Sequence, residues 1–399
     1  MAAFNLRDRQ LPRPIRVAMM IAGFETDRIK LALEPEAASI WCQVINTSIK
    51  SDLGKTGSQY MVVDLGGKFI GGTADISVHE KNIDGTLKEI HRASGGPWGG
   101  TSVDHNFIKW LTKLFGEEAM SRFQNEETAD YFDILREFEL KKRTITPDTE
   151  GLVTFRVSVA LKEIHDKVSG MKINDMLAAM KLEDDMSFQR DKLRVSADIV
   201  RSWFSESIGQ TVQHIINLLK ETRMEKLTTV ILVGGYDECG LAVLKGAVRF
   251  GHLPNLITSR VVKHTYGFQV RTVFEKDVHP LEKMVFADGK EKIENVFRKV
   301  VEIDKEILIG KPITAPGRQF LRMVGNSTLN IFISSDRNPA LVTDKSCMRL
   351  GGLDLGQAKS ERAEDNAVIV DFLFGETELE VRVRTKFDGC EKKCVVDCL

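Results

Sequence analysis

The sequence lacks the features that mark several specialised classes of protein. Six cysteines in 399 residues are too few for a disulfide scaffold. No apolar run approaches the roughly 20 residues that a membrane helix requires, and a formal net charge of -1 provides no basic surface for nucleic acid. The eight histidines form no H-E-x-x-H pair, so no catalytic zinc site is indicated. We therefore expect a globular cytoplasmic protein that binds neither membranes nor nucleic acid.

Each end of the chain carries a pattern with two interpretations. Four arginines precede the apolar residues 17–22, as in a signal peptide, but the run is short and Glu25 follows where small residues should mark cleavage. A short helix packed on the domain is therefore favoured. At the other end, Cys390, Cys394 and Cys398 are four residues apart, which would place three thiols on one face of a helix. That spacing matches no common zinc motif, so ordinary tail cysteines are favoured.

The most informative stretch is residues 60–80, which reads YMVVDLGGKFIGGTADISVHE. An apolar run leads into Asp64, glycines follow, and apolar and polar residues then alternate, which predicts a strand, a glycine turn and a second strand. The N–H groups of such a turn can cradle a phosphate, while the Asp64 carboxylate holds Mg²⁺ through water. An ordinary hairpin explains these residues equally well. The glycines are Gly66, Gly67, Gly71 and Gly72.

Two other places combine a turn with the start of a helix. Residues 29–33 predict a short strand that leads into a helix at Glu34. This carboxylate either positions water as a general base or stabilises the helix dipole, and the second role is the more common. Residues 94–101 form a second glycine-rich turn before a predicted helix at 103–111. That turn either binds an anion at the helix N-terminus or only reverses the chain.

The remaining sequence predicts an α/β protein followed by a β domain. Residues 117–192 have mainly helical periodicity, and residues 228–233 are a continuous apolar run that predicts a buried strand. The strand ends at Gly234, and ligands in open α/β sheets bind beyond such strand ends. Neither G-x-G-x-x-G nor G-x-x-x-x-G-K-[ST] is present. From about residue 277, short alternating segments predict antiparallel strands.

Six motifs then occur in the order known from one protein family. They resemble the nucleotide-binding domain of the heat shock 70 kDa proteins, which has the actin-like ATPase (ribonuclease H-like) fold, and are like the divergent type 12 subgroup. The segments LNIFISSD, RLGGLDL and DFLFGETELEVRV resemble the peptide-binding β-sandwich of the same family. The six motifs are ALEPEAASIWC (32–42), VVDLGG with GTADISVHE (62–80), GGPWGGTSVD (95–104), KKRTIT (141–146), ILVGGYDECGL (231–241) and TYG (265–267).

The resemblance implies a role for each matching residue. Glu34 corresponds to the carboxylate near the attacking water, Asp64 to the aspartate that holds Mg²⁺ through water, and Thr73 to the hydroxyl that faces the γ-phosphate. The other residues implied in binding ATP or ADP are Gly66, Gly67, Gly71, Gly72, Asp75, Gly99 and Gly100 around the phosphates, and Glu139, Lys142, Arg143, Gly234, Gly235 and Tyr236 around the adenosine.

The sequence departs from the family pattern at two places. The family's first phosphate loop, D-x-G-T-T, and the lysine after it are absent upstream of Ala32, so we expect an incomplete first lobe. Four extra residues also lengthen the turn between Asp64 and Thr73. The expected domains are a remnant of the first ATPase lobe at 1–58, a second lobe at 59–275 with its helical insert at 117–192, and a β-sandwich-like domain at 276–399.

The resemblance implies a chaperone-type heat shock protein of the stress response that binds ATP or ADP with Mg²⁺. Both departures weaken the phosphate clamp, so we expect weak nucleotide binding and, at most, slow ATP hydrolysis. An extended peptide or client protein is the expected partner of the β domain, by strand addition. The alternative is a non-enzymatic interaction or scaffold protein of the same fold, and a sugar kinase of the same superfamily is a distant third.

Overall fold

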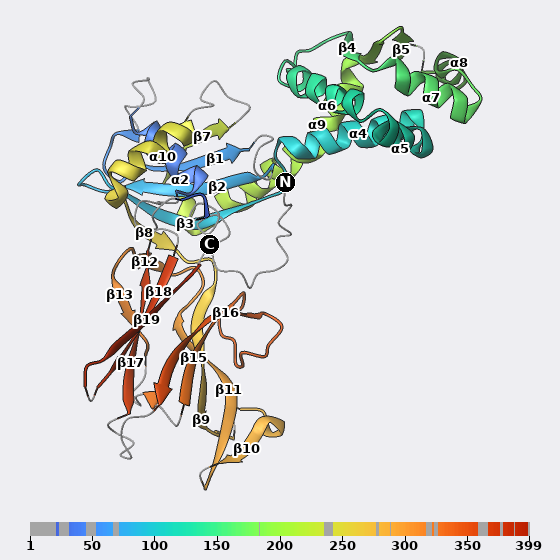
Figure 1. Ribbon diagram of the computed structural model, residues 1–399. Coiled ribbons are helices and arrows are strands. Elements are labelled where there is room, and N and C mark those ends of the chain that lie inside the picture. Colours follow the sequence, from blue (N-terminus) through green and yellow to red (C-terminus); the bar gives the residue numbers. More distant parts are fainter. Residues whose placement is uncertain are drawn as a thin grey trace.

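The computed structural model consists of an α/β part, residues 32–261, and a β part, residues 262–397 (Figure 1). A helical insert projects from the sheet of the α/β part. The residues that the structure describes are 21–23, 32–44, 53–66, 72–182, 184–234, 242–276, 279–287, 289–316, 321–322, 326–357, 366–375, 378–386 and 388–397.

The α/β part is built on a six-stranded sheet with the order β12-β8-β3-β2-β1-β7. The predicted strand, turn and strand are β1 and β2, which pair antiparallel, while β7 runs parallel to β1 on its other side. The two strands beside β1, which are β2 and β7, therefore both carry motifs that the sequence analysis singled out. The strands are β1 (Gln59–Leu65), β2 (Ala74–Lys81), β3 (Leu87–Gly96), β7 (Leu227–Gly234), β8 (Ile257–Val261) and β12 (Glu306–Leu308).

Helices cover both faces of this sheet because β1 is apolar on both sides. Tyr60 and Val62 share a core with α2 (Glu34–Cys42) and α10 (Ala242–His252). Met61 and Val63 pack on the other face against Leu218 of α9 (Ala197–Leu219). Burial on two faces is the reason why the residues before Asp64 form a continuous apolar run.

The helices α2 and α10 cross at a very short distance. A Cβ atom on Gly246 of α10 would lie 1.7 Å from the backbone oxygen of Ala37 in α2, so only glycine fits at this crossing. Glu36 of α2 is also buried and pairs with Arg260 of β8, with 2.7 Å between its Oε1 and the arginine Nε. These contacts fix α2, which begins at Glu34, on the sheet.

The expectation that residues 228–233 are buried is wrong. The strand β7 alternates between covered and exposed residues, and Val230 and Leu232 are 43% and 55% exposed. The physical reason is its position, since β7 ends the strand order and has a neighbouring strand on one side only within the described part of the chain. A continuous apolar run therefore did not distinguish an outer strand from a central one.

The insert has its own aromatic core. Phe107 of α4 stacks on Phe138 of α6, with ring centroids 3.9 Å apart, and Trp203 of α9 contacts both rings. Besides helices, residues 117–192 contain the short strands of a three-stranded sheet, β4-β6-β5. The elements are α4 (Gly100–Phe115), α5 (Glu117–Glu126), α6 (Thr128–Lys142), β4 (Leu152–Arg156), α7 (Val159–Ser169), α8 (Ile173–Ala179), β5 (Met186–Gln189) and β6 (Lys192–Ser196).

The β part contains two antiparallel sheets that share one hydrophobic core. Phe268 on one sheet and Phe372 on the other are buried and lie 6.3 Å apart between ring centroids. Its correspondence to a peptide-binding β-sandwich stays a prediction. The strands are β9 (Thr265–Val273), β10 (Met284–Ala287), β11 (Lys290–Val301), β15 (Asn326–Ser334) and β16 (Cys347–Gln357) in one sheet, and β13 (Pro312–Thr314), β14 (Leu321–Arg322), β17 (Ala367–Phe374), β18 (Glu378–Thr385) and β19 (Glu391–Asp397) in the other.

The tail cysteines do not lie on a helix. Cys394 is in β19, opposite Val381 of β18, and packs partly against the core, whereas Cys390 precedes the strand and is exposed. Cys398 lies outside the described residues. In a strand, residues four apart also share a face, but they lie about 13 Å apart along it, so no shared thiol site follows from this spacing.

Within the ranges given above, each helix is too short or too polar to cross a bilayer.

Replacement of Gly246 tests the close crossing of α2 and α10. We expect Gly246→Ala to lower the free energy of unfolding by about 1–3 kcal/mol, because the added methyl group overlaps the Ala37 backbone. Gly251→Ala, in the same helix with open space around its Cβ position, is the matched control and should be neutral or slightly stabilising. Urea denaturation measures both, and equal effects of the two substitutions would contradict the crossing.

Candidate functional site

The two glycine-rich turns of the sequence lie against each other. The hairpin closes where the Gly66 N–H donates to the backbone oxygen of Thr73 at 2.9 Å. At the start of α4, the N–H of Gly99 donates to Gly72 O at 2.7 Å and that of Gly100 to Gly66 O at 3.1 Å. A Cβ atom on Gly72 would overlap the Thr101 hydroxyl, at 1.6 Å. These glycines are therefore required for contact between the two turns.

The N–H groups that join the two turns belong to Gly99 and Gly100, which the family resemblance assigns to phosphate binding. The amides of the N-cap residue Gly99 and of Gly100, the first residue of α4, already have backbone partners. Their predicted approach to the phosphates stays a prediction, and it would depend on later amides of the same helix end. Gly67 and Gly71, also predicted to bind phosphate, lie outside the described residues.

A third glycine borders the carboxylate at the end of β1. Gly234 ends β7 with a φ angle of 112°, where a Cβ atom would be 2.7 Å from Asp64 Oδ1 and 2.4 Å from Leu65 O. Only glycine combines this left-handed backbone with the close approach. The strand end predicted near the adenosine therefore reaches Asp64 itself, whereas Gly235 and Tyr236 lie outside the described residues.

Three carboxylates from three elements interact at this place. Asp64 is 3% exposed at the end of β1, and burial raises its pKa to about 6, with further contributions from the negative charges of Glu34 and Asp75. Burial also raises the pKa of Glu34, at the first residue of α2, and the charge of Asp75 adds to the shift. A position at a helix start alone would lower the pKa of Glu34, so burial and repulsion outweigh the helix dipole.

The Thr73 hydroxyl is directed at one of these carboxylates. Its Oγ1 donates a hydrogen bond of 2.6 Å to Asp75 Oδ2. The hydroxyl proton of Thr73 is therefore already donated to Asp75. Thr73 would have to break this hydrogen bond before it could donate to a phosphate oxygen.

A second cluster joins the helices α4 and α6. The buried ammonium group of Lys142 lies 2.7 Å from Asp104 Oδ1, 2.6 Å from Glu139 Oε2 and 3.2 Å from Gly100 O. Arg143 is exposed and pairs with Glu139 through Nε and a terminal nitrogen, at 3.1 and 2.7 Å. Lys142 thus attaches the end of α6 to the start of α4, and Arg143 is the member of this group that faces solvent.

Sequence reasoning missed Asp104 in this cluster. The signal was present, since Asp104 ends the motif GGPWGGTSVD, but it lies 38 residues from Lys142. The lysine reaches it because α4 and α6 pack side by side through Phe107 and Phe138. The pairing therefore depends on tertiary contacts that no local pattern encodes.

Within the described ranges, no group of three or more His, Cys, Asp or Glu side chains is arranged to bind a metal ion directly. Negative charge is nevertheless concentrated in one partly buried place by Glu34, Asp64 and Asp75. The raised pKa of Asp64 is a consequence of this burial and charge. Such a set suits a hydrated cation that contacts carboxylates through its water molecules, as Mg²⁺ often does.

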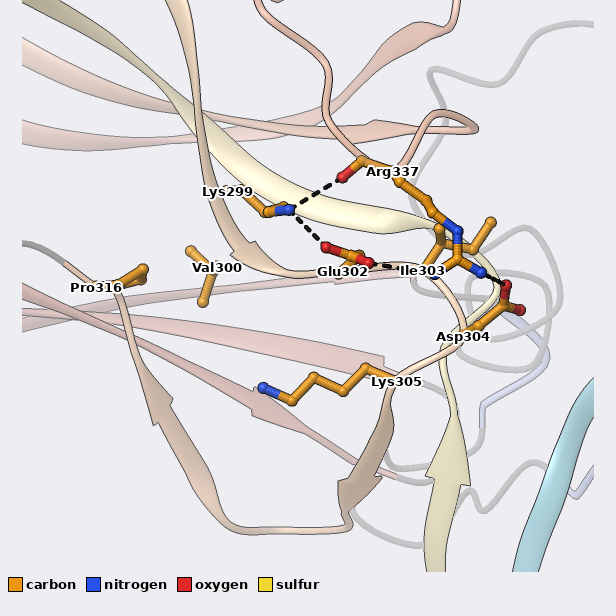
Figure 2. Close-up of a pocket in the computed structure, with 8 residues that line it drawn as sticks. All are labelled: Lys299, Val300, Glu302, Ile303, Asp304, Lys305, Pro316 and Arg337. Atoms are coloured by element: carbon orange, nitrogen blue, oxygen red, sulfur yellow. Dashed lines mark hydrogen bonds and ion pairs between the residues drawn. The ribbon is translucent and has the colours of Figure 1, made fainter. Parts of the chain in front are cut away.

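A cavity of about 380 Å³ lies elsewhere, next to the turn that joins β11 to β12. Figure 2 shows its lining, which comes from the β part and includes none of the predicted site residues. The candidate nucleotide site is therefore separate from this cavity.

Comparisons with known proteins support the family indicated by the motifs. The chain is 26% identical to human heat shock 70 kDa protein 12B over 92% of its length, and 27% identical to human and mouse heat shock 70 kDa protein 12A over 90%. Chaperone protein DnaK of Elusimicrobium minutum is 26% identical over 59% of the chain and 32% of its own length. No family model matches the chain.

The chain matches only part of the length of its curated relatives. The chain spans 65% of the length of 12B and 56% of that of 12A. Its similarity over nine-tenths of its own length confirms the predicted relation to the type 12 subgroup of the heat shock 70 kDa proteins.

The raised pKa of the buried Asp64 carboxylate should make the stability of the protein depend on pH. Since the pKa of Asp64 is raised from 3.8 to about 6, the folded protein binds more protons than the unfolded chain between these values. Stability should therefore fall as the pH rises from 4 to 6. Asp64→Asn should weaken this dependence, to which the raised pKa values of Glu34 and Glu89 also contribute. It should raise the free energy of unfolding at pH 7 by about 1–2 kcal/mol, less than the full pKa shift implies, because partial solvation screens the charge.

The measurement is urea denaturation of the nucleotide-free protein without Mg²⁺ at pH 4 and pH 7. Asp148→Asn, in an exposed turn, is the matched control and should leave the pH dependence unchanged. An Asp64→Asn variant with the pH profile of the unmodified protein would show that Asp64 is not the group responsible.

Proposed function

We propose that this relative of the heat shock 70 kDa proteins binds an adenine nucleotide as its Mg²⁺ complex, where the β1–β2 turn, the start of α4 and the end of β7 meet. The observation that carries the proposal is the convergence of Glu34, Asp64 and Asp75 beside these glycines, with the pKa of Asp64 raised to about 6. A hydrated Mg²⁺ would supply the positive charge that this group lacks, and a phosphate chain would share the ion.

Residues at the end of β1 would bind the phosphates and Mg²⁺, and residues near the end of β7 would border the adenosine. Asp64 and Asp75 would hold the water molecules of Mg²⁺ at the end of β1, and Gly66 and Gly72, the described ends of the turn, would lie beside the phosphates. Gly234 brings the end of β7 close to Asp64, so an adenosine bound beyond this strand end would lie next to the carboxylate. Arg143, exposed at the end of α6, is the cation available on the adenosine side.

Hydrolysis would require Glu34 to orient a water molecule toward the terminal phosphate. Its raised pKa increases its basicity, which suits this role. Two arrangements argue for slow turnover, since the Thr73 hydroxyl donates to Asp75 and the Gly99 N–H donates to Gly72 O. Donors that are already engaged cannot stabilise developing charge without first breaking those bonds.

The same arrangements favour a second candidate function. A protein that keeps the fold and binds nucleotide without turnover would act as an interaction protein, with the β part as its binding surface. Extended peptides that add a strand to the β part remain the proposed partners, in keeping with the chaperone role named for DnaK. A cytoplasmic location is part of the same proposal.

Calorimetric titration with Mg-ATP and Mg-ADP tests nucleotide binding. We expect measurable heat for the unmodified protein and binding that is weaker by at least about tenfold for Asp64→Asn, because the carboxylate that holds the hydrated ion is lost. Asp148→Asn should bind like the unmodified protein. Absence of heat, together with an unchanged Tm at millimolar nucleotide, would refute the proposal.

Substitution of Glu34 separates turnover from binding. If Glu34 orients the attacking water, Glu34→Gln should reduce the release of phosphate from ATP by about 10²-fold while the affinity for Mg-ADP stays within a few-fold. Turnover that survives this change would exclude the role given to Glu34. Nucleotide binding without any turnover in the unmodified protein would support the second candidate.

A further inference from the structure

The cavity near the junction of the two parts is lined by an unusual share of charged side chains. It is bounded by the end of β11, the turn at 302–305 that leads into β12, Pro316 after β13, and Arg337 from the loop after β15. Its volume is about 380 Å³, enough for a small molecule or a few side chains. Figure 2 shows its charged residues on two sides, with Arg337 and Lys305 apart.

On the Arg337 side, positive and negative groups alternate. Glu302 lies between Lys299, at 2.6 Å, and Arg337, at 3.2 Å. Asp304 lies between Arg337, at 2.7 Å, and Arg92 of β3, at 3.3 Å. Each carboxylate is therefore shared by two cations, and this row of five residues carries one net positive charge. The neighbouring cations offset the negative charges of Glu302 and Asp304, so these carboxylates repel an approaching anion only weakly.

The Pro316 side has cations without such partners. Figure 2 shows the Lys305 side chain extending toward Val300 and Pro316 and away from the row of ion pairs. Arg298 donates to Pro316 O at 3.3 Å, and among the described residues no carboxylate pairs with Arg298 or Lys305. Beside them, Val300 and Ile303 are buried and apolar. One uncompensated cation, Lys305, thus lines the cavity next to an apolar wall, and a second, Arg298, lies at its edge through the contact with Pro316.

We infer that this cavity is an anion-binding site, in which Lys305 and Arg298 bind a carboxylate or phosphate group and the wall of Val300, Ile303 and Pro316 packs against an apolar neighbour of that group. A negatively charged ligand gains from both cations, and charge-assisted hydrogen bonds to an oxyanion are among the stronger polar contacts. The ion-paired row contributes further attraction through its net positive charge. The site is separate from the proposed nucleotide site and does not depend on it.

Two probes distinguish the sources of such a group. One is inorganic phosphate, and the other is the capped tripeptide Leu-Glu-Leu, with Leu-Gln-Leu as its uncharged control. Calorimetric titration of the full chain is carried out at constant ionic strength, balanced with NaCl, because exposed charges are screened by salt. We expect at least one oxyanion probe to bind and the glutamine peptide to bind at least about tenfold more weakly than the glutamate peptide if the peptide is the ligand.

The matched variants are Lys305→Gln and Lys311→Gln. Lys305 is exposed, and its backbone hydrogen bonds to Glu302 and Val262 remain after substitution, so folding should be preserved. Lys305→Gln should weaken binding about tenfold or more, whereas Lys311→Gln, in the exposed turn after β12, should not. Binding of phosphate alone would assign a free phosphate compound, and binding of the acidic peptide alone a polypeptide segment. Binding of neither probe, or no effect of Lys305→Gln, would overturn the inference.

Discussion

Two backbone hydrogen bonds between the turn after β1 and the start of α4 hold the candidate site together. The N–H groups of Gly99 and Gly100 donate to Gly72 and Gly66, and a Cβ atom on Gly72 or Gly99 would overlap the other turn. The hairpin that ends at Asp64 and the helix that begins the insert are thereby joined, and Lys142 adds a buried ion pair on the same helix end. Displacement of either turn would separate the backbone that we propose to face the phosphates from the carboxylates.

The electrostatics of the site depend on burial more than on secondary structure. Glu34 begins a helix and would be stabilised as an anion if it were exposed there. Burial and the nearby negative charge of Asp75 raise the pKa values of both Glu34 and Asp64 instead. The protein therefore maintains a charge arrangement that is unfavourable by itself, as sites that bind cations commonly do.

Local patterns predicted the parts of the fold that depend on local sequence. The strand, turn and strand around Asp64 and the helix predicted at 103–111, which is α4, followed from periodicity and glycine spacing, and the motif order predicted the family. The exposure of Leu232 was mispredicted and the strand that carries Cys394 was not predicted, because both depend on which strands become neighbours. The ion pair of Lys142 was also beyond prediction, since it joins residues far apart in the sequence.

The strand β12 has a consequence for how the molecule would respond to force. It comes from the β part, yet it pairs with β8 and completes the sheet of the α/β part. Further backbone bonds flank the pairing, from Val262 to Lys305 at 3.1 Å and from Ile309 to Thr258 at 3.0 Å. A pull that separates the two parts would therefore load this ladder before it could lengthen the connection between β8 and β9. The joint is a mechanical clamp, in contrast to a flexible tether.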